Sequence, residues 1–290
     1  MPITLNEHLK NEFGFKVYKL ALSAVTTCPN RDGTIGFGGC IFCSEEGSGS
    51  FASPINLSIS EQIETAKAKI KSKTNADKFI AYFQSFTNTY APIEYLEKVF
   101  FEAISHPQVV ILSIATRPDC LPDEVLKLLE KLNKIKPVWV ELGLQTMHEK
   151  TAQYIRRGYS LSCYDNAVEK LKSIGVTIIT HMIIGLPSEN EEMMVKTADY
   201  IGRSGADGIK LQLLHILKGT DLEKDYLAGK FETLSLEKYT EILKKCLAVL
   251  PPDMVVHRMT GDGDKKKLIA PLWSANKKKV LNYINKELYK

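Results

Sequence analysis

The sequence predicts an α/β fold with a parallel sheet, and three features of the chain support this prediction. Short apolar runs alternate with longer amphipathic segments six times in succession. The runs are continuous, as expected of strands whose sheet is covered by helices. Polar segments with several Gly and Pro residues begin where the runs stop. Six strand–helix units in series imply parallel strands joined by right-handed crossovers.

The six predicted strands are, in chain order, residues 20–27, 78–83, 109–115, 138–144, 176–185 and 208–216. Apolar residues recur at helical spacing between them, as in the segment with Ile59, Ile63 and Ile70 on one face. We find no repeat, low-complexity segment or linker that divides the chain. We therefore expect a single domain over residues 1–290, with its core at 18–250 and a short C-terminal extension at 251–290.

Composition indicates a soluble globular protein. The 290 residues are 44% hydrophobic and 25% charged, with no signal-peptide pattern at the start and no run long enough to span a bilayer. We expect a cytoplasmic protein with no membrane partner, in which six cysteines do not form a disulfide framework. The net charge of +4 is weak evidence, but lysines cluster at 265–267 and 277–279. These lysines form either a solvated tail or a contact for an anionic partner.

The polar segments that follow the strands should converge on one rim, because active sites of such folds lie at the carboxyl ends of the strands. The first of them is TTCPNRDGTIGFGGCIFC, residues 26–43, which carries Cys28, Cys40 and Cys43 among four glycines. A packed core would not use such a polar, glycine-rich segment. Three thiols at an active-site position suggest a metal centre.

The number of cysteines distinguishes between kinds of metal centre. A structural zinc site normally takes four ligands, and the neighbouring segments offer no fourth Cys or His. An iron–sulfur cluster held by three cysteines leaves one iron free for a substrate or cofactor. The glycines would let the backbone approach an inorganic cluster without side-chain clashes. Buried cysteines without a ligand are the remaining alternative.

With these features the sequence resembles the radical S-adenosylmethionine (SAM) superfamily. The cysteine spacing is C-x11-C-x2-C instead of the usual C-x3-C-x2-C, and the last pair reads CIFC. The long insertion is similar to that of the YhcC/MnmL-type branch, which is related to the catalytic subunit of Elongator. AYFQSFTNTYAP, VELGLQT, RRGYS, HMIIGLPSE and RMTGDGDKKKLIAPLW support that branch. The resemblance covers nearly the whole chain and implies a partial (β/α)6 barrel of the TIM type.

The resemblance also implies the cofactors and the chemistry. Cys28, Cys40 and Cys43 would hold a [4Fe–4S] cluster whose free iron binds the amino and carboxylate groups of SAM. Reductive cleavage would give methionine and a 5′-deoxyadenosyl radical that abstracts a substrate hydrogen. The residues implied to contact SAM, or substrate at the end of the sixth strand, are Gln84, Thr87, Asn88, Glu141, Gln145, Arg157, Ile184, Gly185 and His215.

Each of these positions has an expected role. The segment that starts at Gln84 replaces the family's GGE-like turn for the SAM amino group. Glu141 and Gln145 match positions that contact the ribose or methionine part, with an ordinary buried polar residue as the alternative. Arg157, with Arg156 as a competitor, suits a bidentate grip on the carboxylate.

Further positions lie towards the C-terminus. Residues 183–187 resemble the segment that holds adenine by its backbone. His215, Lys218 and Thr220 end the sixth strand, and Arg258 and Asp262 are expected to close the site.

The remaining cysteines have simpler expectations. Cys163 and Cys246 lie on helical patterns and are interpreted as small core residues. Cys120 follows the third strand, where a catalytic role is the less favoured alternative.

Three substrate hypotheses stay open from the sequence. The first is tRNA modification at the C5 arm of the wobble uridine, specifically carboxymethylaminomethyluridine to aminomethyluridine. This implies tRNA, a flavodoxin- or ferredoxin-type reductant and a downstream methyltransferase as partners. The second is a small-molecule radical enzyme similar to the oxygen-independent coproporphyrinogen oxidases. The third is a zinc- or cluster-bearing interaction module without enzymatic activity.

Overall fold

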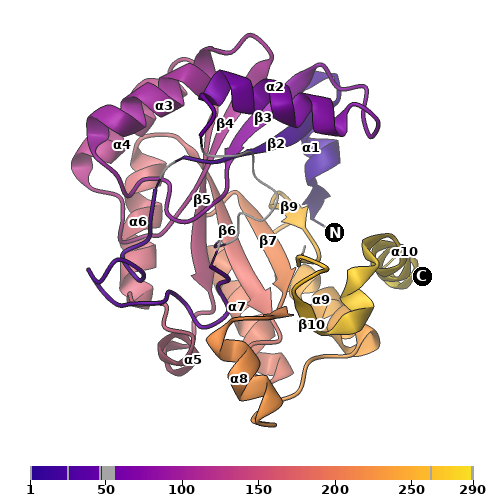
Figure 1. Cartoon of the computed structure of the whole chain (residues 1–290). Helices are drawn as coiled ribbons and strands as arrows, with labels where there is room; N and C mark the ends of the chain where they lie inside the picture. Colours follow the sequence, from indigo (N-terminus) through magenta and orange to yellow (C-terminus); the bar gives the residue numbers. More distant parts are fainter. Residues whose placement is uncertain (1, 25, 46, 48–55, 262, 289–290) are drawn as a thin grey trace.

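The computed structural model describes residues 2–24, 26–45, 47, 56–261 and 263–288. Within these ranges, eight parallel strands form one sheet in the order β1-β9-β7-β6-β5-β4-β3-β2 (Figure 1). The strands are β1 (Ile3–Thr4), β2 (Val17–Leu22), β3 (Lys78–Phe83), β4 (Val109–Thr116), β5 (Val138–Gln145), β6 (Thr177–Ile184), β7 (Gly208–Leu213) and β9 (Val255–Arg258). A second, antiparallel pair joins β8 (Ile216–Leu217) to β10 (Leu268–Ala270).

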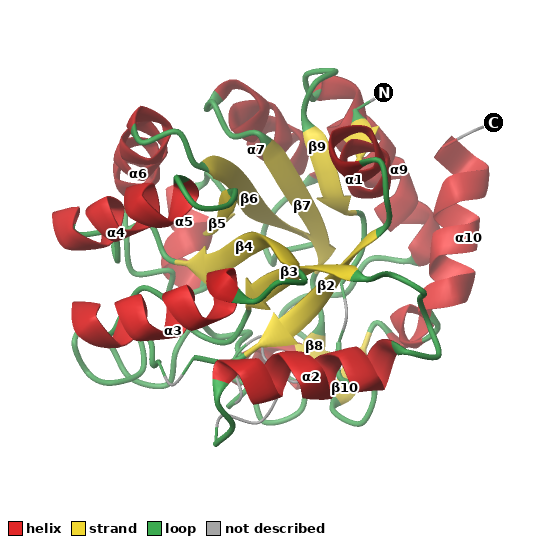
Figure 2. Cartoon of the chain, turned by 90° about the horizontal axis from the view of Figure 1, so that it is seen from above, coloured by secondary structure: helices red, strands yellow, loops and turns green. Residues whose placement is uncertain are grey.

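The helices lie mainly around the outside of the curved sheet (Figure 2). They are α1 (Leu5–Phe13), α2 (Ile59–Ile70), α3 (Ile93–Ser105), α4 (Asp123–Asn133), α5 (Glu149–Tyr154), α6 (Leu161–Ser173), α7 (Glu191–Arg203), α8 (Asp221–Leu227), α9 (Leu236–Val249) and α10 (Lys277–Leu288), with the 3-10 turn η1 at Leu272–Ala275. Over the described part of the chain, no helix has the length and hydropathy needed to cross a bilayer.

The predicted fold class is confirmed, because the sheet is parallel and curls into a half-barrel with helices outside (Figure 2). The six expected strands are β2 to β7. The sequence pattern missed β1 and β9, which are only two and four residues long. Strand β9 lies between β7 and β1 and comes from the expected C-terminal extension, which therefore contributes to the main sheet.

Two predicted strand ends were wrong. The first strand was expected at 20–27 but occupies Val17–Leu22. The chain leaves the sheet at Ser23, because the side chain of Gln62 takes over both backbone groups of that residue: the Ser23 N–H donates to Oε1 (2.8 Å) and the Ser23 carbonyl accepts from Nε2 (3.0 Å). The sixth strand ends at Leu213, and the last residue of its expected range, Ile216, pairs with β10 instead.

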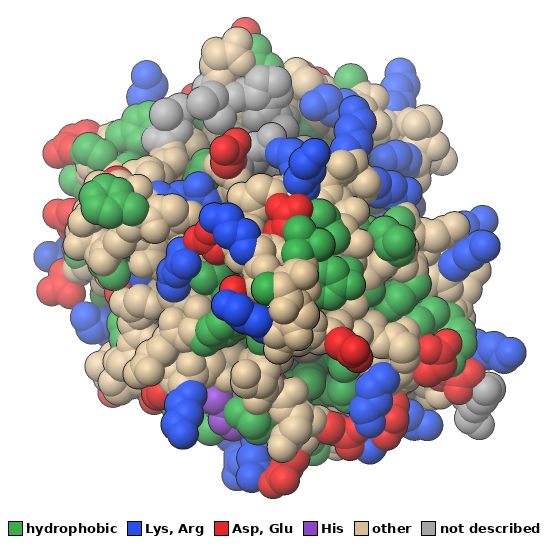
Figure 3. All heavy atoms as spheres, turned by 60° about the horizontal axis from the view of Figure 1, so that its bottom comes forward, with side chains coloured by type: hydrophobic (Ala, Val, Ile, Leu, Met, Phe, Trp, Pro, Cys, Tyr) green, Lys and Arg blue, Asp and Glu red, His purple; other side chains and the backbone are tan. Residues whose placement is uncertain are grey.

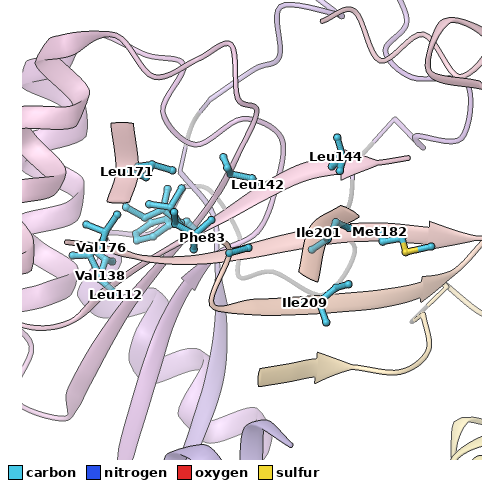
Figure 4. Packing of buried hydrophobic residues seen from close by; sticks show 14 of the residues in the cluster. Phe83, Leu112, Val138, Leu142, Leu144, Leu171, Val176, Met182, Ile201 and Ile209 are labelled. Carbon is cyan, nitrogen blue, oxygen red and sulfur yellow. The ribbon is translucent and has the colours of Figure 1, made fainter. Parts of the chain in front are cut away.

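The main hydrophobic core lies between the sheet and its outer helices. Strand residues such as Phe83, Leu112 and Val138 pack there with Leu171 of α6 and, further along, Ile201 of α7 joins the same cluster (Figure 4). Because these side chains are buried together, the helices stabilise the curved shape of the sheet. The inner face of the sheet carries a different set of side chains.

The amino-terminal end of the half-barrel is closed by α1. This helix starts with a capping box of Thr4 and Glu7 and packs against both β9 and β2, near the two edges of the sheet. Its Leu9 joins Trp139 and Ile179 in an apolar cluster inside the sheet. The opposite end, where the strands finish, therefore remains for the functional loops.

Candidate active site

The cysteine-rich segment follows β2 and folds into a compact loop. The amides of Arg31 and Asp32 bond to the carbonyl of Cys28 (2.7 and 3.3 Å), and the Cys43 amide bonds to the Cys40 carbonyl (2.9 Å). The long insertion between the first two cysteines forms a small hairpin, with a bridge between Asp32 and Phe37. The hairpin lets a C-x11-C spacing bring Cys28 close enough to influence the Cys43 thiol electrostatically.

Asn30 anchors this loop to the segment after α5. Its amide Nδ2 donates to the carbonyls of Arg156 (2.6 Å) and Arg157 (3.3 Å), and lies 3.6 Å from the Cys40 sulfur. Gly158 is required here, because a Cβ at this position would lie 2.8 Å from Oδ1 of Asn30. Its φ of +81° is also a conformation that side chains disfavour. The turn at residues 156–158 therefore has the conformation that packing against the cysteine loop requires.

Ile41, between the last two cysteines, is the second anchor. It is buried in a cluster with Ile155 and Leu222. Its amide donates to the Ile155 carbonyl (3.2 Å), and its carbonyl accepts from the Leu222 amide (2.9 Å). The apolar residue of the CIFC motif therefore fixes the backbone that carries the cysteine pair.

The electrostatics of the loop favour a thiolate at Cys40. Cys43 donates a hydrogen bond to Cys40 and lowers the pKa of the Cys40 thiol to about 7, with Arg117, Asn30 and Arg31 acting in the same direction. The pKa of Cys43 is raised well above its usual range by that hydrogen bond and by burial. Arg117 is held in place by Asp119 through contacts of 2.9 and 2.7 Å.

The donor set fits an iron–sulfur cluster. Ligand cysteines must bind as thiolates, and here one pKa is already lowered by hydrogen bonds and nearby cations. Within the ranges the structure describes, no group of three or more His, Cys, Asp and Glu side chains is arranged as a ready ligand set for a metal ion. The fit therefore rests on the loop that gathers three thiols and on its positive surroundings.

The loop after β3 packs against the cysteine loop. The guanidinium of Arg31 lies over the ring of Phe86, 5.4 Å from its centroid, and the Thr87 amide bonds to the Thr27 carbonyl (3.2 Å). Asn88 is fully buried and donates from Nδ2 to the carbonyls of Phe83 (3.1 Å) and Ala115 (2.9 Å), next to strand ends. Its Oδ1 has no hydrogen-bond partner among the residues that the structure describes. Gln84 continues directly from β3, with its amide bonded to the carbonyl of Leu22 in the neighbouring strand (3.3 Å).

Backbone strain marks the same rim. Among the described residues, four non-glycine positions have positive φ: Phe86, Gln145, Arg156 and Ser188. Each lies at or after the carboxyl end of a strand in β3, β5 or β6. Such conformations cost about 1–3 kcal/mol each and cluster at functional sites. Gln145, at the last residue of β5, is therefore well placed as a site residue.

Arg157 is largely engaged within the protein. It is buried, and its guanidinium donates to the carbonyls of Tyr159 (3.0 Å) and Thr146 (2.6 Å) and to the Glu149 carboxylate (3.2 Å). These contacts hold the loop after β5. Its expected grip on the SAM carboxylate stays a prediction. Its neighbour Arg156 is half exposed and pairs with Asp221 (2.6 Å).

Glu141 lies inside the half-barrel at the centre of an ionic network. Oε1 accepts from Lys19 (2.9 Å) and Ser113 (2.8 Å), while Oε2 contacts His181 (2.7 Å) and Lys210. The lysines hold the pKa of this carboxyl well below its usual range despite burial. Its expected contact with SAM stays a prediction.

Residues near the end of β6 and β7 are covered by the C-terminal segment. Gly185 has φ +95°, and the Ile184 carbonyl accepts from the Leu214 amide (3.0 Å). His215 lies against Gly261, where a Cβ would come within 2.5 Å of its ring, and contacts Ser274 (3.1 Å).

Three further residues expected at the site are Thr220, Arg258 and Asp262. Thr220 caps α8. The side chain of Arg258 lies within electrostatic reach of the Glu141 network. Asp262 lies outside the described residues.

Sequence reasoning missed Lys19, His181 and Lys210. The sequence does contain a sign of these residues, because each is a polar residue within an apolar strand. In the structure, the side chain of each points inward and contacts Glu141. It also missed Glu189, which accepts from the Thr146 hydroxyl (2.5 Å) and whose pKa is raised by burial.

The other three cysteines belong to other segments of the chain. Cys246 is a fully buried core residue of α9, as expected, whereas Cys163 is only half buried. Cys120 and Cys163 line a groove of about 930 Å³ that also touches Ile35 of the cysteine loop. Burial raises the pKa of Cys120 to about 12, which disfavours a nucleophilic thiolate.

Family comparisons agree with this geometry. Residues 26–201 match the radical SAM superfamily, and residues 206–290 match the radical SAM C-terminal domain. The chain is 48% identical to YtqA of Bacillus subtilis over 98% of its length and 88% of that protein. It is 39% identical to YhcC of Escherichia coli K12 over 93% of its length and 86% of that protein.

More distant similarities include a tRNA uridine(34) acetyltransferase and the structure of an archaeal Elp3. The chain is 26% identical to the tRNA uridine(34) acetyltransferase of Methanocaldococcus jannaschii over 53% of its length, but spans only 28% of that protein. Among solved structures, Elp3 of Methanocaldococcus infernus superposes with a TM-score of 0.70 at 19% identity. The match covers 93% of this chain and 63% of that one, and shows the shared fold.

Proposed function

Because the chain belongs to the radical SAM superfamily, whose members are enzymes that use a [4Fe–4S] cluster and SAM, we propose that Cys28, Cys40 and Cys43 hold this cluster. The observation that carries the proposal is the loop after β2, which gathers three thiols at the carboxyl ends of parallel strands. When bound, the cluster and SAM supply a 5′-deoxyadenosyl radical that takes a hydrogen from the substrate.

The chain's own residues prepare this site. Asn30 and Arg117 stabilise negative charge on Cys40, and Ile41 fixes the backbone between the ligands. We assign Gln145, the backbone at 184–185 and His215 to direct contact with SAM or substrate, since they lie at strand ends on the same rim. Glu141 and Arg157 are already hydrogen-bonded within the protein, so we assign them to positioning β5 and its loop.

We propose tRNA as the substrate, modified at the C5 arm of the wobble uridine, with carboxymethylaminomethyluridine converted to aminomethyluridine. The relationship to a tRNA uridine(34) acetyltransferase supports this class. The surface adds a second argument: Lys265 and Lys266 are exposed, and the Lys267 carbonyl accepts from the amide of exposed Lys218 (2.7 Å). Two separate segments thus bring lysines together beyond β7, where phosphates would be contacted.

The lysines at 277–279 support an RNA contact less directly than those at 265–267. They begin α10, which packs on α9 at the side of the molecule. Basic side chains are spread over the face at the bottom of Figure 1, between acidic and hydrophobic ones (Figure 3). A long RNA that crosses this face would contact scattered cations. A flavodoxin- or ferredoxin-type protein is the proposed reductant, and Phe37, an exposed residue of the cysteine loop, offers it a contact.

The test is anaerobic reconstitution with iron and sulfide, followed by SAM, dithionite and tRNA from cells that lack the protein. We expect four iron and four sulfide per chain, 5′-deoxyadenosine, and a changed wobble nucleoside by mass spectrometry. Cys43→Ala should lose the cluster, whereas Cys246→Ala is the matched control and should keep it. SAM cleavage without any change in tRNA would redirect the proposal to a small-molecule substrate. A Cys43→Ala protein that retains a full cluster would refute the ligand assignment.

A further inference from the structure

Arg31 lies near the start of the insertion between the first two cysteines, and it contacts the chain beside all three of them. Its amide donates to the Cys28 carbonyl (2.7 Å). Its side chain lies against Gly39, the residue directly before the second cysteine, where an added Cβ would come within 3.0 Å of Nε. Its guanidinium donates to the carbonyl of Ser44, the residue directly after the third cysteine (2.5 Å). One residue therefore links the three parts of the loop that carry thiols.

The loop after β3 also contacts this guanidinium. The centre of the Phe86 ring lies 5.4 Å from its central carbon. Phe86 in turn packs against Gly47, where an added Cβ would come within 3.1 Å of the ring. A further guanidinium nitrogen donates to the Glu45 carbonyl (3.4 Å). A side chain that stacks on a ring and donates to two carbonyls must be planar and carry several N–H donors, which Arg provides and Lys does not.

The long insertion gives these contacts their importance. Eleven residues separate Cys28 from Cys40, and a longer loop costs more conformational entropy to close. Asn30 and Ile41 fasten the loop to other segments of the chain, whereas the side chain of Arg31 fastens the first part of the loop to its last part. Arg31 therefore opposes opening of the loop.

The positive charge of Arg31 also reaches the thiols. It acts on both Cys40 and Cys43 and favours the anionic form of each. An iron–sulfur cluster gains negative charge when it is reduced, and the net charge of the site is one of the factors that set its reduction potential. A cation held near the ligands stabilises the more negative, reduced form. Arg31 therefore makes reduction of a cluster in this loop more favourable.

We propose that Arg31 is a positioning residue that closes the cysteine loop around the cluster and raises the reduction potential of the cluster. The inference deepens the proposed function and rests on it, because it requires Cys28, Cys40 and Cys43 to be the ligands. The two effects depend on different properties of the side chain. Closure of the loop depends on its planar set of donors, and the reduction potential depends on its charge. Replacing Arg31 by Lys and by Gln therefore separates them.

The first measurement is the release of iron from anaerobically reconstituted protein to a chelator, without SAM or reductant. Arg31→Lys and Arg31→Gln should both release iron about tenfold faster than the native chain, the effect of losing one charge-assisted hydrogen bond. Neither side chain can donate to both carbonyls and stack on Phe86 at the same time. Circular dichroism of each cluster-free variant checks that the fold is unchanged.

The second measurement is a redox titration followed by the electron paramagnetic resonance signal of the reduced cluster. This signal reports only the chains that hold a cluster, so a partly loaded variant is still measured. Arg31→Gln should shift the equilibrium about tenfold away from the reduced form, which lowers the potential by about 59 mV for one electron. Arg31→Lys keeps the charge and should stay near the native potential. A residue that only supports the fold would not produce this difference between the two variants.

The matched control is Arg203→Gln, which removes the same charge from an exposed position at the end of α7 and should change neither value. Iron release within about twofold of the native rate in both Arg31 variants overturns the inference. An unchanged potential in Arg31→Gln overturns it as well. Either result would leave the ligand assignment standing, whereas a native chain that takes up no cluster would overturn the proposed function and the inference with it.

Discussion

Replacing Glu141 by Gln should destabilise the protein far more than loss of an ordinary ion pair. The carboxylate is completely buried and contacts four side chains, and Lys210 among them is almost as deeply buried. The Gln side chain keeps the shape but leaves the lysine without its counter-charge. Removing one partner of a buried pair typically costs about 3–5 kcal/mol in the free energy of unfolding. Lys19 is partly solvated and adds little to this cost, so we expect a value near 3 kcal/mol.

The measurement is urea unfolding of cluster-free protein, followed by circular dichroism at pH 7 under anaerobic conditions. At this pH the contribution of Glu141 is fully present: its folded pKa lies below the usual 4.5, so stability from this group is lost only as pH falls below that value. Glu130→Gln is the control, because its pair with Lys134 is exposed on one helix and worth about 0.3–0.5 kcal/mol.

A second variant separates loss of charge balance from loss of packing. Combining Glu141→Leu with Lys210→Met removes both buried charges, and most of the stability should return because no uncompensated ion remains inside. A loss below about 1 kcal/mol for Glu141→Gln, or an equally large loss in the double variant, would refute the reasoning.

Three further predictions follow from other parts of the structure. Gly158→Ala should hinder cluster reconstitution, because its Cβ would press on Asn30 at a φ of +81°; normal iron and sulfide content would contradict this. His181→Gln should flatten the fall in stability between pH 6.5 and 4, since the native imidazole has a pKa lowered to about 4 and resists the proton that the unfolded chain accepts; identical pH profiles would exclude it. Changing lysines 265–267 to Ala should weaken tRNA binding and reduce the salt slope by about 0.7–0.9 per lost phosphate contact, while an unchanged slope would remove these lysines from the interface.

The sequence by itself determined the order of strands and helices and the position of the cysteine loop. Continuous apolar runs identify β3 to β6 within about one residue, because buried parallel strands need apolar side chains on both faces. Polar residues at strand ends placed Cys28, Cys40 and Cys43 on the correct rim, since parallel strands all finish at one edge. The resemblance to a known family depended on those same residues.

Very short strands, and contacts between residues far apart in the sequence, could be identified only from the tertiary structure. Strand β9 has four residues and is held by its neighbours β7 and β1, so no local pattern reveals it. The end of β2 is set by Gln62, thirty-nine residues away in sequence. The requirement for glycine at 158 appears only when Asn30 is seen packed against it.

The interior charges show the same division most clearly. Lys19, Glu141 and Lys210 are visible in the sequence as polar interruptions of apolar runs, and each taken alone looks like an ordinary strand residue. Only the curling of the sheet brings three strands, separated by up to 191 residues (210 − 19), to one point. Electrostatic energy depends on distance in space and on burial, which a linear pattern does not contain. The chain therefore specifies which groups carry charge, and the closed fold decides that these charges meet.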